Sequence, residues 1–374
     1  MNILFITPSY FPLRGGTEQV IYELSSLLRD KHKITILTRR ITEDMKPHEV
    51  INSVEIYRSK LTHIKGLRLL LDSLFLFFLA MKLHKRKRFD LIHMFHVFEV
   101  GGGAILFKTL KRLPQIITLM GWDTYSPLRK IPKHCTKYME LVLNGADIVT
   151  APSYSLSKIA AEQGCRKKVE IIPHGSKMVE NQKGSIKKDI TDNSMFEGKR
   201  LILSVQRLKR VKGLEYLINA IPEIVGSNKN AYFIIAGKGD QENNLKNLVK
   251  KLNIMEYVYF PGFVNHELLP SYYSIADLFV LPSLYETFGL VYIDALSFGV
   301  PVVTTENGGS LDIIDELKGI LVPPKDSKKL AEAVIKALNM TWNPEIIKKG
   351  LEKYHWENII LKYQMLYSKI TDNI

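Results

Sequence analysis

The sequence predicts an α/β protein made of two doubly wound domains. Its length of 374 residues exceeds that of one ordinary domain. Short apolar segments alternate with amphipathic helical segments, which is typical of parallel sheets covered by helices. A polar stretch interrupts this alternation near the middle of the chain, and the same pattern then starts again. The two runs of alternation therefore predict two separate sheets.

The first predicted domain covers residues 1–182. Its expected strands and helices follow one another along the chain, so that the strands pair in parallel. Helices are expected at residues 17–29 and 67–83, and strands at residues 2–7, 34–38, 91–94, 116–119 and 147–151.

A linker is expected at residues 183–199, which are polar and poor in large apolar side chains. The second predicted domain covers residues 200–354. Both domains are expected to be Rossmann-like, with parallel strands that alternate with helices. Its expected helices lie at residues 214–224 and 241–252, and its strands at residues 200–205, 232–236, 257–260, 278–281 and 300–304.

The C-terminal segment, residues 355–374, is expected to be helical. Aromatic and aliphatic residues from Trp356 to Tyr367 recur at spacings of three and four, which gives the helix one apolar face. We expect this helix to pack back on the first domain.

The composition favours anionic partners. The formal net charge is +14, with 46% hydrophobic and 24% charged residues. Basic and aromatic residues are not interleaved as in a nucleic-acid platform, so no nucleic acid is expected. The two cysteines, Cys135 and Cys165, lack metal-like spacing and suit a reducing compartment, and the first residues do not resemble a signal peptide. A cytoplasmic protein is therefore expected.

One apolar segment, residues 67–88, raises the question of contact with a membrane. Charged residues interrupt it, and its uncharged run is shorter than the roughly 20 residues that a membrane span needs. It ends in a cluster of lysines and arginines. Two interpretations remain: a buried helix with a basic end, or an interfacial helix lying on anionic lipid at the inner face of the cell membrane.

Candidate ligand-binding residues follow the expected strands, because parallel sheets bind ligands at the carboxyl ends of their strands. Gly15 and Gly16 lie between the first strand and its helix, where glycines allow backbone amides to approach a phosphate. The alternative is an ordinary turn. Arg207 and Lys212 follow the first strand of the second domain and could offset the charge of a diphosphate leaving group. The alternative is a solvated basic loop.

The most specific stretch runs from Pro282 to Ala295. Glu286 supplies a carboxylate suited to a pair of sugar hydroxyls. Free amides near Phe288, Gly289 and Leu290 suit phosphate oxygens at a helix start. The alternative for Glu286 is a helix N-cap, for which glutamate is a poor residue.

Weaker candidates follow other strands of the second domain. Gly237 belongs to a Gly-Lys-Gly loop. The segment Pro261–Val264 is suited to binding a base through its backbone near Phe263 and Val264, and the alternative is an ordinary turn. Asn307-Gly-Gly is expected near the phosphates. No histidine pair has metal-ligand spacing beside a carboxylate, so neither a metal nor another cofactor is expected.

Together these motifs resemble the retaining glycosyltransferases of family 4, which have the GT-B fold. That fold consists of two Rossmann-like domains facing a central cleft. Arg207 and Lys212 match the R-x4-K pair that binds the donor diphosphate in the family, and Glu286 with Asp294 matches its E-x7-E motif. The resemblance implies that Glu286 holds the donor sugar and that the second carboxylate, Asp294, binds the ribose.

The segment from Thr118 to Asp123 resembles the family segment that contacts the donor sugar, through Met120 and Gly121 here. Asp123 and His96 are expected on the acceptor side. The sequence departs from the family at Met120, where a histidine is frequent, and at Asp294, where glutamate is usual. His174 stands where the family commonly has asparagine.

The resemblance implies transfer of a sugar from a UDP- or GDP-sugar to a lipid-linked or glycan acceptor, with retention of configuration, in the synthesis of a surface polysaccharide, glycolipid or glycoprotein glycan. The cationic pair would offset the charge of the leaving diphosphate. Two alternatives remain. One is an epimerase of the same fold that acts on a nucleotide sugar, and the other is a non-catalytic partner subunit that keeps the fold.

Overall fold

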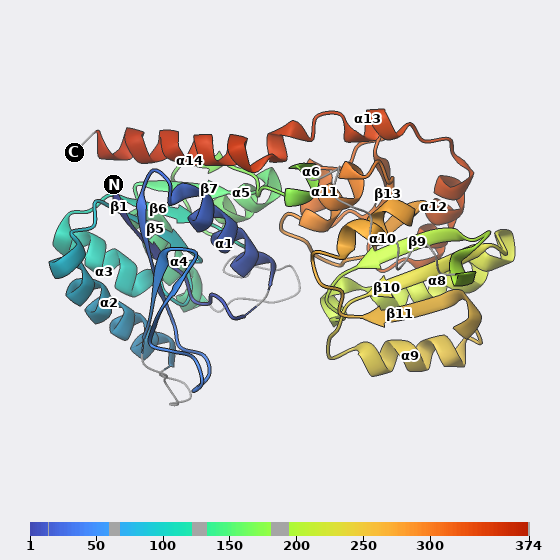
Figure 1. Cartoon of the computed structure of the whole chain (residues 1–374), viewed down its shortest axis with the longest axis horizontal. Coiled ribbons are helices and arrows are strands. Elements are labelled where there is room, and N and C mark those ends of the chain that lie inside the picture. Colours follow the sequence, from blue (N-terminus) through green and yellow to red (C-terminus); the bar gives the residue numbers. More distant parts are fainter. Residues whose placement is uncertain (14, 60–67, 122–132, 181–193, 373–374) are drawn as a thin grey trace. The chain divides into compact units, whose positions relative to one another are not determined.

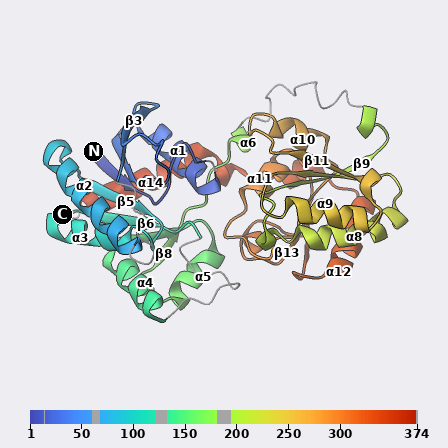
Figure 2. The same ribbon diagram turned by 90° about the horizontal axis from the view of Figure 1, so that it is seen from below.

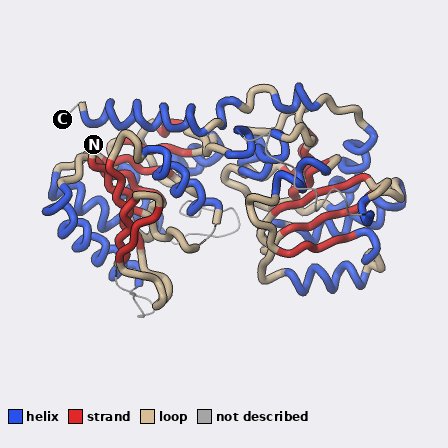
Figure 3. Tube along the Cα trace, viewed as in Figure 1, coloured by secondary structure: helices blue, strands red, loops and turns tan. Residues whose placement is uncertain are grey.

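The structure is a computed structural model that describes residues 1–13, 15–59, 68–121, 133–180 and 194–372. The chain forms two compact units. The first comprises Met1–Gly175 together with Trp356–Ile374, and the second comprises Ser176–His355. Each unit has its own sheet. Strands are red and helices are blue in Figure 3.

The sheet of the first unit has eight strands in the described residues, in the order β3-β4-β2-β1-β5-β6-β7-β8. All neighbours are parallel except β3 and β4. The strands are β1 (Asn2–Ile6), β2 (Lys33–Thr38), β3 (His48–Ile51), β4 (Val54–Arg58), β5 (Leu91–Phe95), β6 (Gln115–Thr118), β7 (Ile148–Ala151) and β8 (Val169–Ile171).

Helices cover both faces of this sheet (Figure 1). Leu4, Ile92 and Ile117 form one apolar core with residues of four helices, and Figure 2 shows two of these, α2 and α3, side by side. The four are α2 (Arg68–Lys87), α3 (Gly101–Lys111), α4 (Lys133–Gly145) and α5 (Tyr154–Glu162). Helices α1 (Gly16–Leu28) and α14 (Trp356–Thr371) contact each other elsewhere in the unit.

A buried polar cluster ties α14 to the sheet of the first unit. The His93 ring shares hydrogen bonds of 2.7 Å with the hydroxyls of Tyr367 and Thr118. Burial lowers the pKa of His93 to about 3, so this ring is neutral at physiological pH. Trp356, the first residue of α14, packs where a side chain on Gly175 would lie, at 2.4 Å. The aromatic residues of the C-terminal segment therefore belong to the core of the first unit.

The second unit has a fully parallel sheet of six strands in the described residues, in the order β11-β10-β9-β12-β13-β14. The strands are β9 (Arg200–Val205), β10 (Ala231–Ala236), β11 (Val258–Gly262), β12 (Leu278–Leu281), β13 (Val302–Thr305) and β14 (Gly319–Val322).

Two apolar cores lie on the two faces of this second sheet. Ile202 and Phe233 share one core with α8 (Leu214–Ser227), α9 (Glu242–Lys251) and α12 (Ser327–Asn339). Leu203 and Ile234 share the other with α6 (Lys177–Glu180), α10 (Leu269–Ile275), α11 (Leu290–Ser297) and α13 (Pro344–Lys348). Alternate residues of β9 and β10 thus face opposite helical layers, as the pleat of a buried strand requires.

The structure confirms the predicted fold class and refines several boundaries. Pro261 and Gly262 were expected to follow a strand but belong to β11. The expected linker at residues 183–199 lies mostly outside the described residues, and the units divide earlier, between Gly175 and Ser176. Phe196, within the expected linker, lies in a short 3-10 helix and packs on Tyr232 and Tyr259 of the second unit.

No helix among the described residues is long and apolar enough to cross a membrane. Helix α2 extends from Arg68 to Lys87 and therefore includes the basic residues that follow its apolar part.

Candidate active site

The strand order of the second unit indicates where a ligand binds. β10 and β11 lie on one side of β9, and β12 lies on the other. The loops that leave β9 and β12 therefore run in opposite directions from neighbouring strand ends. Such a reversal of strand order is the preferred ligand-binding position in open parallel sheets. Arg207 and Lys212 follow β9, and Glu286 follows β12.

Lys212 and Glu286 meet in an ion pair at this position. The Lys212 ammonium donates to Oε1 of Glu286, and the Ser283 hydroxyl donates to the same oxygen at 3.0 Å. The two charged side chains are only 16% and 12% exposed. An opposite pair with this little exposure to solvent interacts more strongly than a surface pair and also costs more to desolvate. The structure thus places a cation and a carboxylate together at the strand ends.

The backbone around this ion pair is closely packed. The Leu284 amide donates to the Val211 carbonyl at 2.9 Å, which joins the two loops. Gly213 follows Lys212 with φ of 62°, and a Cβ there would lie 2.2 Å from the Pro282 carbonyl oxygen. Only glycine fits a position that combines positive φ with such close backbone contact. The sequence therefore fixes the short 3-10 helix Arg210–Lys212 against the Glu286 loop.

Arg207 is placed differently from Lys212. Its side chain is exposed, and within the described ranges no hydrogen bond or ion pair holds its guanidinium. The loop that carries it is nevertheless anchored, because the Gln206 amide donates to the Ala236 carbonyl and the Leu208 amide to the Lys238 carbonyl, both at 3.0 Å. The guanidinium is therefore free to move at the end of a fixed backbone.

Helix α11 begins just after the Glu286 loop. Its N-cap is Gly289, with φ of 90°, which has no side chain to cap the first amides. The preceding Phe288 is 4% exposed and its ring lies 5.9 Å from that of Tyr354, which anchors the start of the helix. Uncapped amides and the positive end of the helix dipole at Leu290 suit a phosphate group.

The segment Asn307–Gly309 is joined to the Glu286 loop by backbone hydrogen bonds. The Glu286 amide donates to the Asn307 carbonyl and the Gly309 amide to the Glu286 carbonyl, both at 2.9 Å. The Asn307 side chain is 4% exposed and donates to the Tyr292 hydroxyl at 2.8 Å. Its amide group is therefore part of a buried network that holds the loop, rather than a group open to a ligand.

Asp294 lies on α11, one turn beyond the helix start, and is buried. It is 6% exposed, and the Ser176 hydroxyl donates to its Oδ1 at 2.6 Å. Burial raises the pKa of Asp294 to about 7, although the hydrogen bond from Ser176 acts in the opposite direction. A ribose contact by this carboxylate would have to compete with Ser176.

The remaining predicted residues of the second unit surround the same strand ends. Gly237, with φ of 145°, donates its amide to the Gly262 carbonyl at 2.7 Å, and a Cβ there would lie 1.8 Å from the Gln206 carbonyl oxygen. Phe263, just beyond β11, is 57% exposed, and Val264 is half-buried. An exposed aromatic ring beside a strand end offers a stacking surface for a base.

The first unit has an equivalent reversal of strand order, between β1 and β5. The loop with Gly15 and Gly16 follows β1, His96 follows β5, and Met120 and Gly121 follow β6, so the strand order brings these residues to one edge. His96 and Met120 are buried, and His96 and Gly121 have positive φ values of 69° and 107°. Asp123 lies outside the described residues.

The carboxylate of Glu18 lies where Gly15 and Gly16 were predicted to contact a phosphate. It accepts a hydrogen bond of 2.5 Å from the Ser9 hydroxyl and lies 2.5 Å from the Cβ position of Gly15. A negative group in the first turn of α1 already complements the helix dipole there. This charge disfavours a phosphate at the same place, so the donor role of Gly15 and Gly16 stays a prediction.

Three contributors were missed by sequence reasoning: Ser283, Ser176 and the supporting role of Asn307. Ser176 and Asn307 act through hydrogen bonds to residues distant in sequence or to a loop backbone, whereas Ser283 donates to a side chain close in sequence. Isolated serine residues give no periodic signal. Ser283 lies three residues before Glu286 and was the easiest to find. The described residues contain no group of three His, Cys, Asp or Glu side chains arranged to hold a metal ion.

Comparison with known proteins gives the family. The sequence models described as "Glycosyltransferase Family 4" and "Glycosyl transferases group 1" match residues 14–176 and 185–353. An uncharacterised glycosyltransferase of Methanocaldococcus jannaschii is 30% identical, with 96% of each chain covered.

Solved structures agree in fold. Sucrose-phosphate synthase from Thermosynechococcus elongatus has a TM-score of 0.82 at 22% identity, with both chains fully covered. The Anabaena protein HepE in complex with UDP-glucose has a TM-score of 0.78 at 19% identity, covering 99% of this chain and 100% of that one. The chain belongs to the family 4 glycosyltransferases and has the GT-B fold.

Proposed function

We propose that this glycosyltransferase takes its sugar from a nucleotide diphosphate donor bound by the second unit, and transfers it with retention of configuration. The observation that carries the proposal is the Lys212–Glu286 ion pair, four residues before the uncapped start of α11. A cation, a carboxylate and the first amides of a helix are thereby gathered at the strand ends of one unit.

Each part of a nucleotide diphosphate sugar has a suitable partner there. The diphosphate fits the Lys212 ammonium, the Arg207 guanidinium and the first amides of α11. Sugar hydroxyls fit the Glu286 carboxylate as an acceptor of hydrogen bonds. The base fits the exposed Phe263 ring. The HepE structure supports this donor class, because that protein of the same fold is described in complex with UDP-glucose.

In the proposed reaction, the anomeric carbon exchanges its bond to the donor for a bond to the acceptor. The bond between the anomeric carbon and the β-phosphate oxygen breaks, and a bond from the acceptor hydroxyl oxygen forms on the same face of the sugar. The acceptor proton passes to the departing diphosphate. Arg207 and Lys212 offset the negative charge that develops on that diphosphate, which is the main electrostatic contribution asked of the protein.

We propose that the acceptor binds the first unit, near His96, and is lipid-linked or a growing glycan. The feature that favours a membrane-bound acceptor is α2, which exposes Leu74, Phe75 and Phe78 and continues into exposed basic residues. Apolar side chains beside cations suit the surface of an anionic membrane. The protein would then act as a peripheral enzyme in the cytoplasm.

A thermal-shift and turnover panel tests the donor proposal. UDP, GDP, ADP and their common sugar conjugates are added to the wild type and to Arg207→Ala. A ligand at 100 times its dissociation constant should add about 2.7 kcal/mol to the wild type. Turnover of the matching donor sugar should fall by about 10²- to 10³-fold in the variant, by analogy with the loss of one charge-stabilising donor.

Arg210→Ala is the matched control, because Arg210 is an exposed arginine of the same loop. It should keep both the shift and the turnover. Near-normal turnover in Arg207→Ala would contradict the proposal. A donor converted to its epimer without any acceptor would favour an epimerase, and nucleotide binding without any reaction would favour a non-catalytic subunit.

A further inference from the structure

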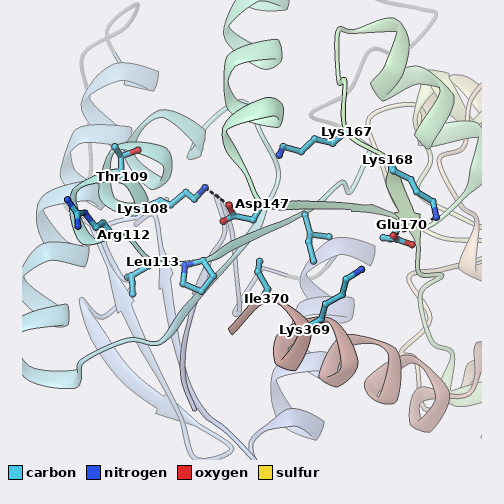
Figure 4. Close-up of a pocket in the computed structure, with 12 residues that line it drawn as sticks. Lys108, Thr109, Arg112, Leu113, Asp147, Lys167, Lys168, Glu170, Lys369 and Ile370 are labelled. Carbon is cyan, nitrogen blue, oxygen red and sulfur yellow. Dashed lines mark hydrogen bonds and ion pairs between the residues drawn. The ribbon is translucent and has the colours of Figure 1, made fainter. Parts of the chain in front are cut away.

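A cavity of about 800 Å³ lies in the first unit, at the amino ends of several strands of its sheet. Its lining comes from the end of α3, the starts of β6, β7 and β8, and the end of α14, as Figure 4 shows. His96, Met120 and Gly121 lie at the carboxyl ends of their strands, whereas this cavity lies at the amino ends. It is therefore separate from the site described above.

The lining is strongly basic. Five cations line the cavity against two carboxylates, and they are Lys108, Arg112, Lys167, Lys168 and Lys369. The carboxylate of Asp147 is already satisfied, because Lys108 donates to it at 2.9 Å and the Gln115 amide at 2.8 Å. Lys369 also has an interaction of its own and is left out of the count. With the Lys108–Asp147 pair removed as well, Arg112, Lys167 and Lys168 remain beside Glu170, a balance of +2.

Two of these cations have no partner in the described part of the chain. Neither the Arg112 guanidinium nor the Lys167 ammonium makes a hydrogen bond or an ion pair there. Lys168 is 87% exposed and lies 4.0 Å from Glu170, which is a weak contact. The positive charge is therefore available to a ligand.

Helix dipoles explain only part of this charge. Lys108 and Arg112 lie at the end of α3 and Lys369 in the last turn of α14, where cations complement the negative end of a helix. Lys167 and Lys168 lie in the connection between α5 and β8, outside any helix end. Helix dipoles therefore do not account for Lys167 and Lys168.

The rest of the lining is apolar. Leu113, Pro114, Ile148 and Ile370 contribute to it, and Pro114 and Ile370 are buried. A ligand that fits both parts carries a phosphate for the cations and a carbon body for the apolar surface. The volume is within the range of small-molecule sites.

We infer that this cavity is a second anion site, which binds an organic phosphate at the amino edge of the first sheet. A soluble phosphate ester and the headgroup of an anionic phospholipid share the chemistry that the lining recognises. The inference does not depend on the proposed donor, because no residue of the cavity belongs to the second unit.

Hydrogen exchange of the full-length chain locates the site. Glucose 6-phosphate, and separately vesicles of phosphatidylglycerol in phosphatidylcholine, are added to the wild type. Slower exchange is expected at residues 108–114 and 165–170 with at least one probe. Protection by the soluble ester identifies a soluble ligand, and protection by the vesicles alone identifies a lipid headgroup.

Variants test whether the cations cause the binding. Arg112→Gln with Lys167→Gln should weaken the effective probe at least tenfold. Lys328→Gln with Lys349→Gln removes the same charge from exposed positions of the second unit and should leave the affinity unchanged. Arg207→Ala should also leave it unchanged, which separates this site from the donor site. Equal affinity in both double variants, or no protection of either segment by either probe, would overturn the inference.

Discussion

At the residue scale, Asp294 shows how burial changes the chemistry of a motif position. Asp294 is 6% exposed, and its carboxylate accepts a hydrogen bond of 2.6 Å from the Ser176 hydroxyl. Burial in apolar surroundings disfavours the charged form and raises the pKa of Asp294 to about 7. Near neutral pH this carboxyl is therefore partly protonated, unlike an exposed aspartate.

A pH dependence of stability follows from this pKa. Between about pH 4 and pH 7 the folded protein holds a proton on Asp294 that the unfolded chain has released. The free energy of unfolding therefore falls as the pH rises through this window, by up to ~1.4 kcal/mol per pH unit from this group. Asp294→Asn removes the titration, so the variant should gain stability relative to the wild type between pH 5 and pH 7.5 in urea unfolding.

Asp30→Asn provides a control, because the side chain of Asp30 is 81% exposed. The difference in stability between this variant and the wild type should stay flat over the same pH range. A flat difference for Asp294→Asn as well would mean that Asp294 keeps an ordinary pKa in the folded protein.

Individual residues also show which features of the site could be predicted from the sequence. Glu286 and Lys212 were predicted from their motifs, and the structure brings them into contact although they are 74 positions apart. The hydrogen bond of Asp294 to Ser176 spans 118 positions and could not be predicted. Contacts of this kind depend on side-chain direction and burial, which a local pattern does not contain.

At the element scale, a single glycine sets the position of the cationic loop. Gly213 ends the short helix that carries Lys212 and begins α8. Its φ of 62° and the carbonyl oxygen of Pro282, 2.2 Å from the Cβ position, leave no space for a side chain. The ion pair with Glu286 depends on this close approach.

Gly213→Ala should therefore destabilise the protein by more than ~1 kcal/mol and lower turnover, because both φ and the backbone contact resist the added methyl group. Gly226→Ala is the control within the same helix, where a Cβ meets nothing within 4 Å. That change should leave turnover intact and stabilise the folded protein by up to ~1 kcal/mol. Thermal unfolding and a turnover assay measure both; equal behaviour of the two variants would contradict the argument.

At the scale of the whole molecule, the proposed membrane surface is the largest of the proposed partners. Phe78 of α2 is 63% exposed and Phe75 36% exposed, and Lys82, Lys85 and Arg86 of the same helix are exposed. A helix buried on one side only keeps such residues available for lipid.

Flotation with vesicles measures this association. More of the wild-type protein should float with phosphatidylglycerol vesicles than with neutral phosphatidylcholine vesicles, and high salt should reduce the difference. Phe78→Ser should reduce flotation severalfold. Leu361→Ser, at a 53% exposed position of α14, should not. Equal recovery with neutral and anionic vesicles would remove the electrostatic part of the proposal.

The sequence by itself determined the fold class, the order of most strands along the chain and the motif positions. These follow from the alternation of apolar segments and from glycines and charges at strand ends, which are local patterns. The strands β3, β4, β8 and β14 were not predicted. β3 and β8 contain no buried residue, so they lack the apolar run that marks strands of similar length such as β6.

Only the tertiary structure decided which of these residues meet. It placed Lys212 on Glu286, buried Asp294 against Ser176, brought α14 to His93, and assembled the basic cavity from α3, β8 and α14. The physical reason is that packing of the two faces of each sheet fixes which distant segments become neighbours. Burial among those neighbours then sets the charge and exposure of each side chain.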